Sequence, residues 1–256
     1  MTNFRRPAAA GTVVLGAGVL VHLVPGVTSW RRARCLLAPR LSGVGDPRHV
    51  ALTFDDGPDP VSTPSFLDEL DRLGWQATFF VLGSQIRKDV GLTAEIAARG
   101  HELAVHGDRH VSHLRRPYPW TVDDVTRCRD TVAEILGFAP RWFRPPYGAV
   151  SASTLVAAKK ANLQLVLWTS WGRDWRPQST PASVTADVTR TLRPGATVLL
   201  HDSDDTSAPD SWRAALGALP ELADRWDAAG LQVGPLGEHG LADTRRILAP
   251  SVRVRS

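Results

Sequence analysis

Two adjacent carboxylates, Asp55 and Asp56, end an apolar run in the segment T-F-D-D-G-P. Successive residues of a strand point in different directions, so one carboxylate can bind a metal ion while the other stays free as a general base. A solvated turn is the alternative, because Asp-Gly-Pro is also a common turn sequence. The pair does not suit a glycosidase, whose two carboxyl groups face each other about 5–9.5 Å apart across a sugar.

A second group of candidate ligands is the pair His106 and His110 in the segment H-G-D-R-H. Two imidazoles and one carboxylate suit zinc with open positions for water. No glutamate stands between the histidines, which excludes the H-E-x-x-H pattern of metalloproteases. The cysteines, Cys35 and Cys128, form no C-x-x-C pair, so a zinc site has to use histidine and carboxylate. Two independent histidines are the alternative.

A third histidine, His201, follows the apolar run V-L-L. Asp174 is a candidate partner that would raise the pKa of this imidazole, so that it arrives protonated as a general acid. A structural role is the alternative for a histidine at this position. Trp171 and Trp175 flank Asp174 and suit a wall on which a sugar stacks. We expect four tryptophans to cluster on this rim: Trp142, Trp168, Trp171 and Trp175.

Short β-branched runs alternate with helical runs from residue 48 onward, a pattern typical of an α/β fold with a mostly parallel sheet. Strands are predicted at residues 49–54, 77–82, 101–105, 142–144, 163–168, 197–200 and 231–233. Helices are predicted at residues 63–73, 91–99, 122–136, 153–161, 181–191 and 212–229, two of them with a threonine N-cap before proline, at Thr63 and Thr180. The repeats favour a closed or nearly closed barrel, whose site lies where the strands end.

The composition places the chain among globular proteins, since 43% of its 256 residues are hydrophobic and 22% are charged. The charge is distributed unevenly. Residues 1–45 carry six arginines and no acid, so residues 46–256 hold a net charge of −2 although the whole chain holds +4. The body therefore offers no broad surface that neutralises phosphates, and we expect no nucleic-acid partner.

Residues 8–27 form an apolar stretch without formal charge, long enough to cross a bilayer. It can be a cleaved signal peptide, an uncleaved signal anchor or a helix packed on the domain. We expect an exported or membrane-anchored protein that faces the cell envelope, with a cytoplasmic protein as the alternative. The predicted organisation is a basic and apolar segment at 1–45, one domain at 46–240 and a basic tail at 241–256.

The candidate motifs, in this order, resemble those of the NodB-type polysaccharide deacetylases, carbohydrate esterase family 4. The match spans about residues 48–235 and rests on T-F-D-D-G-P, H-G-D-R-H, R-P-P-Y-G, R-D-W and L-L-H. The resemblance implies a distorted (β/α)7 barrel, the NodB homology domain, preceded by the hydrophobic segment. It also implies a hydrolase that removes acetyl groups from N-acetylated sugars of a polysaccharide, with a metal-bound water attacking the acetyl carbonyl.

The resemblance assigns roles to individual residues. Asp55 is the base, and the metal ligands are Asp56, His106 and His110. The metal is expected to be Zn²⁺, or else Co²⁺, Ni²⁺ or Mn²⁺. The other catalytic residues are Arg144, which orients the base, Tyr147, whose backbone N–H faces the oxyanion, Asp174, which tunes the acid, and the acid His201. The substrate-binding residues are Trp175, Leu199 and Pro146, and the stacking surface expected of Trp171 adds this residue to them.

Two positions depart from the family pattern. Gly107 stands where the family usually has a serine or threonine that braces the loop, and Asp108 is a candidate replacement. Trp171 stands in place of an acid that commonly holds the arginine of the third motif, here Arg144. We expect Trp171 to narrow the cleft or to add a stacking surface.

The leading hypothesis is a monomeric deacetylase acting on an acetylated glycan such as a chitin oligomer or peptidoglycan. The alternatives are a catalytically silent glycan-binding relative and a metal-dependent amidase or esterase acting on a small acetylated substrate. The acidic loop with Asp202, Asp204 and Asp205 is predicted to be a solvated rim.

Overall fold

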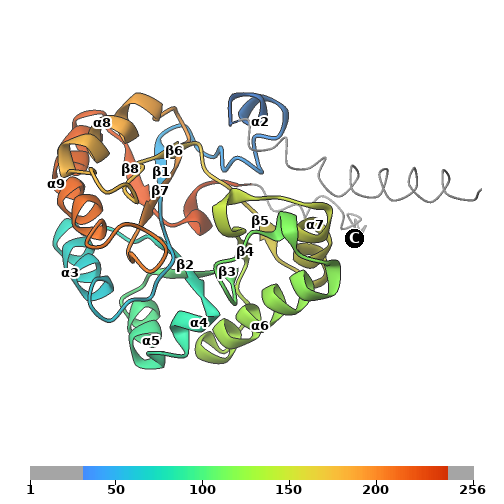
Figure 1. Ribbon diagram of the computed structural model, residues 1–256. Coiled ribbons are helices and arrows are strands. Elements are labelled where there is room, and N and C mark those ends of the chain that lie inside the picture. Colours follow the sequence, from blue (N-terminus) through green and yellow to red (C-terminus); the bar gives the residue numbers. More distant parts are fainter. Residues whose placement is uncertain (1–30, 242–256) are drawn as a thin grey trace, which may run out of the picture.

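A computed structural model describes residues 31–241 of the chain (Figure 1). The hydrophobic segment predicted at residues 8–27 and nearly all of the basic tail lie outside these residues. Within the described range, no helix combines the length and the apolar character needed to cross a membrane.

A parallel sheet forms the centre of the molecule, in the strand order β5-β4-β3-β2-β1-β7-β6, with β8 pairing the start of β1. The strands are β1 (His49–Asp55), β2 (Thr78–Leu82), β3 (Glu102–Gly107), β4 (Trp142–Phe143), β5 (Gln164–Leu165), β6 (Ser170–Trp171), β7 (Thr197–His201) and β8 (Gln232–Gly234). All seven residues of β1 are buried, as is typical of a parallel strand covered on both faces. The strands curl into a half-barrel, so the α/β prediction is confirmed.

Helices surround the strands on the outside (Figure 1). They are α2 (Arg31–Leu37), α3 (Thr63–Leu73), α4 (Gly83–Ile86), α5 (Val90–Ala98), α6 (Tyr118–Leu136), α7 (Ala152–Lys160), α8 (Pro181–Thr191) and α9 (Trp212–Ala228). The predicted N-cap Thr180 is confirmed, since its side chain accepts a hydrogen bond from the Ser183 N–H. The predicted N-cap Thr63 is wrong: it is the first helical residue, and its hydroxyl donates to Asp202 instead.

Alternation along β1 separates two apolar clusters. Leu52 and Phe54 belong to the larger cluster, which includes buried residues of the surrounding helices. Ala51 belongs to a smaller cluster, whose members also include Phe80 and Ala104. Because successive side chains of a strand point to opposite faces, Asp55 lies on the same face as Ala51, inside the half-barrel.

The predicted strand at 163–168 is wrong in its second half. Only Gln164 and Leu165 are in β5, and the separate strand β6 precedes Asp174. The intervening backbone finds partners on several elements: the Leu167 N–H donates to the Leu41 carbonyl and the Thr169 N–H to the Thr197 carbonyl. Residues 166–169 therefore cross between the two ends of the sheet.

Candidate active site

The carboxyl ends of β1, β3 and β7 bring the predicted catalytic groups together. Asp55, the last residue of β1, pairs in register with Phe80 of β2 on one side and with His201 of β7 on the other. The next residue, Asp56, has a φ of 78°, in the left-handed region that aspartate tolerates better than most residues. The backbone thus turns sharply after Asp55.

Asp56, His106 and His110 form the predicted group of ligands. The Nε2 atoms of His106 and His110 lie 3.3 Å and 3.4 Å from Oδ1 of Asp56. Ligand atoms around a tetrahedral zinc, each about 2.0–2.2 Å from the metal, lie about 3.4 Å from one another. Oδ1 of Asp56 is buried and has no hydrogen-bond partner in the described part of the chain. These three side chains therefore fit a divalent metal.

Hydrogen bonds prepare the ligands for a metal. The Arg144 carbonyl, 2.8 Å from Nδ1 of His106, only accepts, so Nδ1 carries the proton and Nε2 presents a lone pair. The Thr206 hydroxyl donates to Oδ2 of Asp56 at 2.6 Å. Burial lowers the pKa of His110 to about 4, which keeps the imidazole neutral. Burial opposes the Asp56 carboxylate, but the nearby imidazoles of His106, His201 and His110 lower its pKa nonetheless.

Asp55 is held by a fully buried arginine. Nη1 of Arg144 donates to Oδ1 of Asp55 at 2.6 Å and to the Thr53 hydroxyl at 2.9 Å. Nη2 donates to the Leu167 carbonyl, and the guanidinium lies 4.0 Å from the centre of the Phe80 ring. Trp171 stands where the family pattern has an acid that would hold this arginine. Here the Leu167 carbonyl and the Phe80 ring support Arg144 instead. Its Nε is buried without a hydrogen-bond partner among the described residues.

His201 and Asp174 form the second charged pair. Oδ1 of Asp174 lies 3.0 Å from Nδ1 of His201, and Oδ2 accepts the His201 backbone N–H at 2.7 Å. Burial disfavours the imidazolium, but the Asp174 carboxylate, with smaller contributions from Asp56 and Asp55, raises the pKa of His201 to about 10. His201 is therefore protonated at neutral pH, and its other nitrogen, Nε2, is free to donate.

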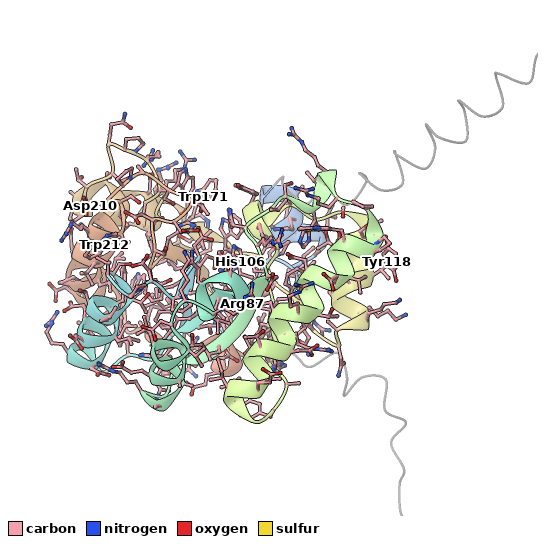
Figure 2. The ribbon with its side chains drawn as sticks, turned by 60° about the horizontal axis from the view of Figure 1, so that its bottom comes forward. Arg87, His106, Tyr118, Trp171, Asp210 and Trp212 are labelled. Atoms are coloured by element: carbon pink, nitrogen blue, oxygen red, sulfur yellow. The ribbon has the colours of Figure 1, made fainter. Side chains whose placement is uncertain are left out.

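A cavity of about 260 Å³ joins these groups. It is lined by Asp55, Asp56, His106, His110, Tyr147, Gly148, Trp168, Trp171, Trp175, Leu199, His201, Thr206 and Ser207. Arg144 and Asp174 are buried behind the cavity, where Arg144 is hydrogen-bonded to Asp55 and Asp174 to His201. Pro146 is buried and directly precedes Tyr147. Figure 2 shows His106 near the middle of the molecule and Trp171 above it.

Three tryptophan rings form one side of the cavity. The ring centres of Trp168 and Trp171 lie 5.9 Å apart, those of Trp171 and Trp175 5.2 Å, and those of Trp175 and His201 5.7 Å. Trp142 does not join them: its indole N–H donates to Glu102 at the start of β3, and its side chain belongs to the smaller apolar cluster. The expectation of four tryptophans on one rim was wrong for this residue.

Asp124, which the sequence reasoning missed, braces the loop that carries both histidines. Its carboxylate accepts the N–H groups of Asp108 and Arg109 at 3.2 and 3.1 Å. A Cβ added to Gly107 would meet that carboxylate at 2.7 Å, and Gly107 has a φ of 108°. The glycine thus makes room for the brace. Asp108 is not the replacement, because its carboxylate pairs with Arg87. No local feature of the sequence signals this contact, which depends on the packing of α6 against β3.

The acidic loop after His201 also differs from expectation. Asp202 is buried, accepts the Thr63 hydroxyl and lies against Gly57, where a Cβ would collide with its carboxylate. Burial raises the pKa of Asp202 to about 7. Only Asp204 and Asp205 reach solvent. Thr206 and Ser207, which line the cavity, had no signal in the sequence.

Comparisons with known proteins agree with this geometry. The family model described as polysaccharide deacetylase matches residues 42–166. A chitooligosaccharide deacetylase of Bradyrhizobium sp. is 36% identical over 205 residues, which cover 75% of this chain and 91% of that protein. The peptidoglycan-N-acetylglucosamine deacetylase PgdA of Listeria monocytogenes is 34% identical over 161 residues, 63% of this chain and 34% of that protein. The solved structure of the Bc1960 peptidoglycan N-acetylglucosamine deacetylase is 25% identical, with a TM-score of 0.74 over 82% of this chain and 97% of that one.

Proposed function

The chain belongs to the polysaccharide deacetylase family of hydrolases, and we propose that it removes acetyl groups from N-acetylated sugars of a polysaccharide with the help of a divalent metal. The observation that carries this proposal is the unpartnered Oδ1 of Asp56, which faces the Nε2 atoms of two histidines between the candidate base and the candidate acid. Asp56, His106 and His110 would hold the metal. When bound, a divalent metal supplies Lewis-acid activation of a water molecule and of the acetyl carbonyl.

Asp55 is the base that accepts the proton of the attacking water. Arg144 occupies Oδ1 of Asp55, while Oδ2 lies 3.8 Å from Nε2 of His106 and so faces the candidate metal site. The buried guanidinium fixes the direction in which this carboxylate points. The Tyr147 backbone N–H would stabilise the oxyanion that develops on the acetyl oxygen.

His201 is the acid that protonates the departing amine. Asp174 holds Nδ1, so Nε2 is the atom that donates the proton when the carbon–nitrogen bond breaks. Trp175 and Leu199 line the cavity and would contact the acetyl methyl group, with Pro146 behind the Tyr147 turn. Trp171 would add a stacking face for a sugar ring.

Several finer assignments belong to the same proposal. The metal is Zn²⁺, with Co²⁺, Ni²⁺ or Mn²⁺ as substitutes that accept the same ligands. The half-barrel corresponds to a distorted (β/α)7 barrel spanning residues 46–240, and the protein acts as a monomer. The relatives named above act on chitooligosaccharide and on peptidoglycan, so both are candidate substrates. Residues 8–27 would export or anchor the protein toward the cell envelope.

A substrate panel tests the proposal against its alternatives. The full chain, loaded with zinc, is expected to release acetate from oligomers of N-acetylglucosamine faster than from small acetylated amides or esters. Faster release from the small compounds would favour an amidase or esterase. Binding of the oligomers without release of acetate from any member of the panel would favour a silent glycan-binding protein.

A further inference from the structure

A second groove, of about 820 Å³, adjoins the active-site cavity and shares His110 and Tyr147 with it. It is lined by His110, Val111, Ser112, Leu114, Arg115, Arg116, Tyr147 and Ala149. The Tyr147 side chain is 65% exposed, and its ring centre lies 4.3 Å from that of His110. A polymer whose acetyl group enters the cavity would pass over this tyrosine into the groove.

The groove is positively charged and has no acidic residue in its lining. Arg115 and Arg116 are exposed, and within residues 31–241 no ion pair joins either guanidinium to a carboxylate. Other surface arginines do have such partners: Arg72, Arg99, Arg127, Arg213 and Arg225. The Arg116 guanidinium rests on the Trp120 ring, 4.9 Å from its centre, which leaves its charge available to a ligand.

The buried side chain of His113 anchors the segment that carries the two arginines. His113 is fully buried, and its ring centre lies 6.0 Å from that of Phe143. Its Nε2 atom lies 3.6 Å from Oδ2 of Asp124. The Arg116 N–H donates to the His113 carbonyl. Because the backbone is already fixed, binding of an anion by these arginines does not have to order the loop.

The opposite side of the active site has the opposite charge. Asp204 and Asp205 lie in the loop that supplies Thr206 and Ser207 to the cavity, and of the two only Asp205 has an ion-pair partner within residues 31–241, Lys88 at 3.6 Å. In Figure 2, Tyr118, just after the arginine pair, and Asp210, just after the acidic loop, lie on opposite sides of His106. A carboxylate carried by the substrate would therefore be drawn to the arginine side of the site and away from the acidic loop.

We propose that this groove binds a carboxylate on a sugar next to the acetylated one, so that the chain prefers an acidic acetylated glycan over a neutral one. Arginine suits this role because its planar guanidinium can donate two parallel hydrogen bonds to a carboxylate. Tyr147 offers an exposed ring on which the intervening sugar stacks. The inference rests on the proposed function and names a substrate class for the same site.

Two matched substrates and two matched variants test it. One substrate is an oligomer of alternating N-acetylglucosamine and N-acetylmuramic acid, whose lactyl group carries a carboxylate, and the other is the same oligomer with that carboxyl reduced to an alcohol. The test variant is Arg115→Gln with Arg116→Gln. The control is Arg48→Gln with Arg193→Gln, which removes equal charge from exposed positions just before β1 and β7, at the other end of these strands.

The quantity measured is the ratio of kcat/KM for the acidic oligomer to that for the reduced oligomer. The groove variant is expected to lower this ratio about tenfold, the combined size of two exposed charge-assisted contacts of about 0.7 kcal/mol each, while the control variant keeps it. An unchanged ratio in the groove variant, or an equal fall in both variants, would overturn the inference. If neither oligomer releases acetate, the proposed function fails, and calorimetric Kd values for the same oligomers and variants supply the ratio instead.

Discussion

At the scale of single residues, the charge of Asp174 decides the protonation of His201. The carboxylate holds the ring at 3.0 Å and raises its pKa to about 10. Since a general acid must carry its proton, activity is present below this pKa and is lost as the pH rises through it. The alkaline limb of the pH profile therefore reports on this ion pair.

We expect Asp174→Asn to move the alkaline limb of kcat/KM to lower pH, toward the ordinary histidine value of about 6.5, because the amide keeps an acceptor but removes the charge. The measurement is kcat/KM against pH. The matched control is Asp123→Asn, which neutralises an exposed acid paired with Arg127. An unshifted alkaline limb in Asp174→Asn would mean that His201 is not the acid.

Asp55→Asn tests the division of labour between the two adjacent carboxylates. Asparagine cannot take the proton of water, so turnover is expected to fall about 100-fold to 10,000-fold. The three metal ligands are untouched, so zinc content should stay near one ion per chain. Metal analysis and acetate release measure the two effects separately. Loss of zinc together with activity would instead make Asp55 a ligand.

At the scale of elements, the loop after β3 depends on a residue of α6. The sequence shows Gly107 as a departure and suggests Asp108 as a replacement brace, whereas the structure shows that Asp124 accepts the loop N–H groups. Local sequence could not identify this partner, because the contact joins residues 15 to 16 positions apart and depends on how α6 packs against β3.

We expect Asp124→Ala to weaken zinc binding about 10-fold to 100-fold, the range for groups that orient metal ligands, because two backbone N–H groups lose their acceptor and His110 is less firmly placed. Asp124→Asn keeps one acceptor oxygen, so its zinc affinity should fall less than that of Asp124→Ala. Competition with a chelator measures the zinc Kd. A variant that melts earlier but binds zinc as the wild type does would show that Asp124 only stabilises the fold.

Helices with strong boundary signals were predicted well, and very short strands were not. The predicted bounds of α3 and α8 agree with the structure, since each has a proline in its first turn and apolar residues at helical spacing. β6 has two residues, too few for any periodicity to appear. Its place is set by pairing with β7, which is a tertiary contact.

At the scale of the whole molecule, the sheet assembles a site from residues spread over about 150 positions of the chain. The motifs placed Asp55, Asp56, His106, His110 and His201 around one cavity, because parallel strands end at the same edge. The sequence alone could not identify Thr206 as a residue of the site. Its contact with Asp56 joins residues 150 positions apart and depends on the path of an irregular loop.

The stability of the same sheet depends on the larger apolar cluster, to which Phe54 belongs. Phe54 is fully buried, with the ring centres of Phe66 and Phe79 both 5.1 Å away. We expect Phe54→Ala to lower the free energy of unfolding by about 3–5 kcal/mol, measured by urea denaturation. Phe138→Ala, at a position 66% exposed, is the control and should change it by less than about 0.5 kcal/mol. Similar losses in both variants would contradict the packing described here.

Zinc titration of the metal-stripped full chain tests the central claim most directly. Acetate release from N-acetylglucosamine oligomers would be followed as zinc is added in fractions of an equivalent. We expect release to rise in proportion to bound zinc and to stop rising at one ion per chain, and His106→Ala to release none at that point. Full release from the metal-stripped chain, or none with one zinc bound, would contradict the account.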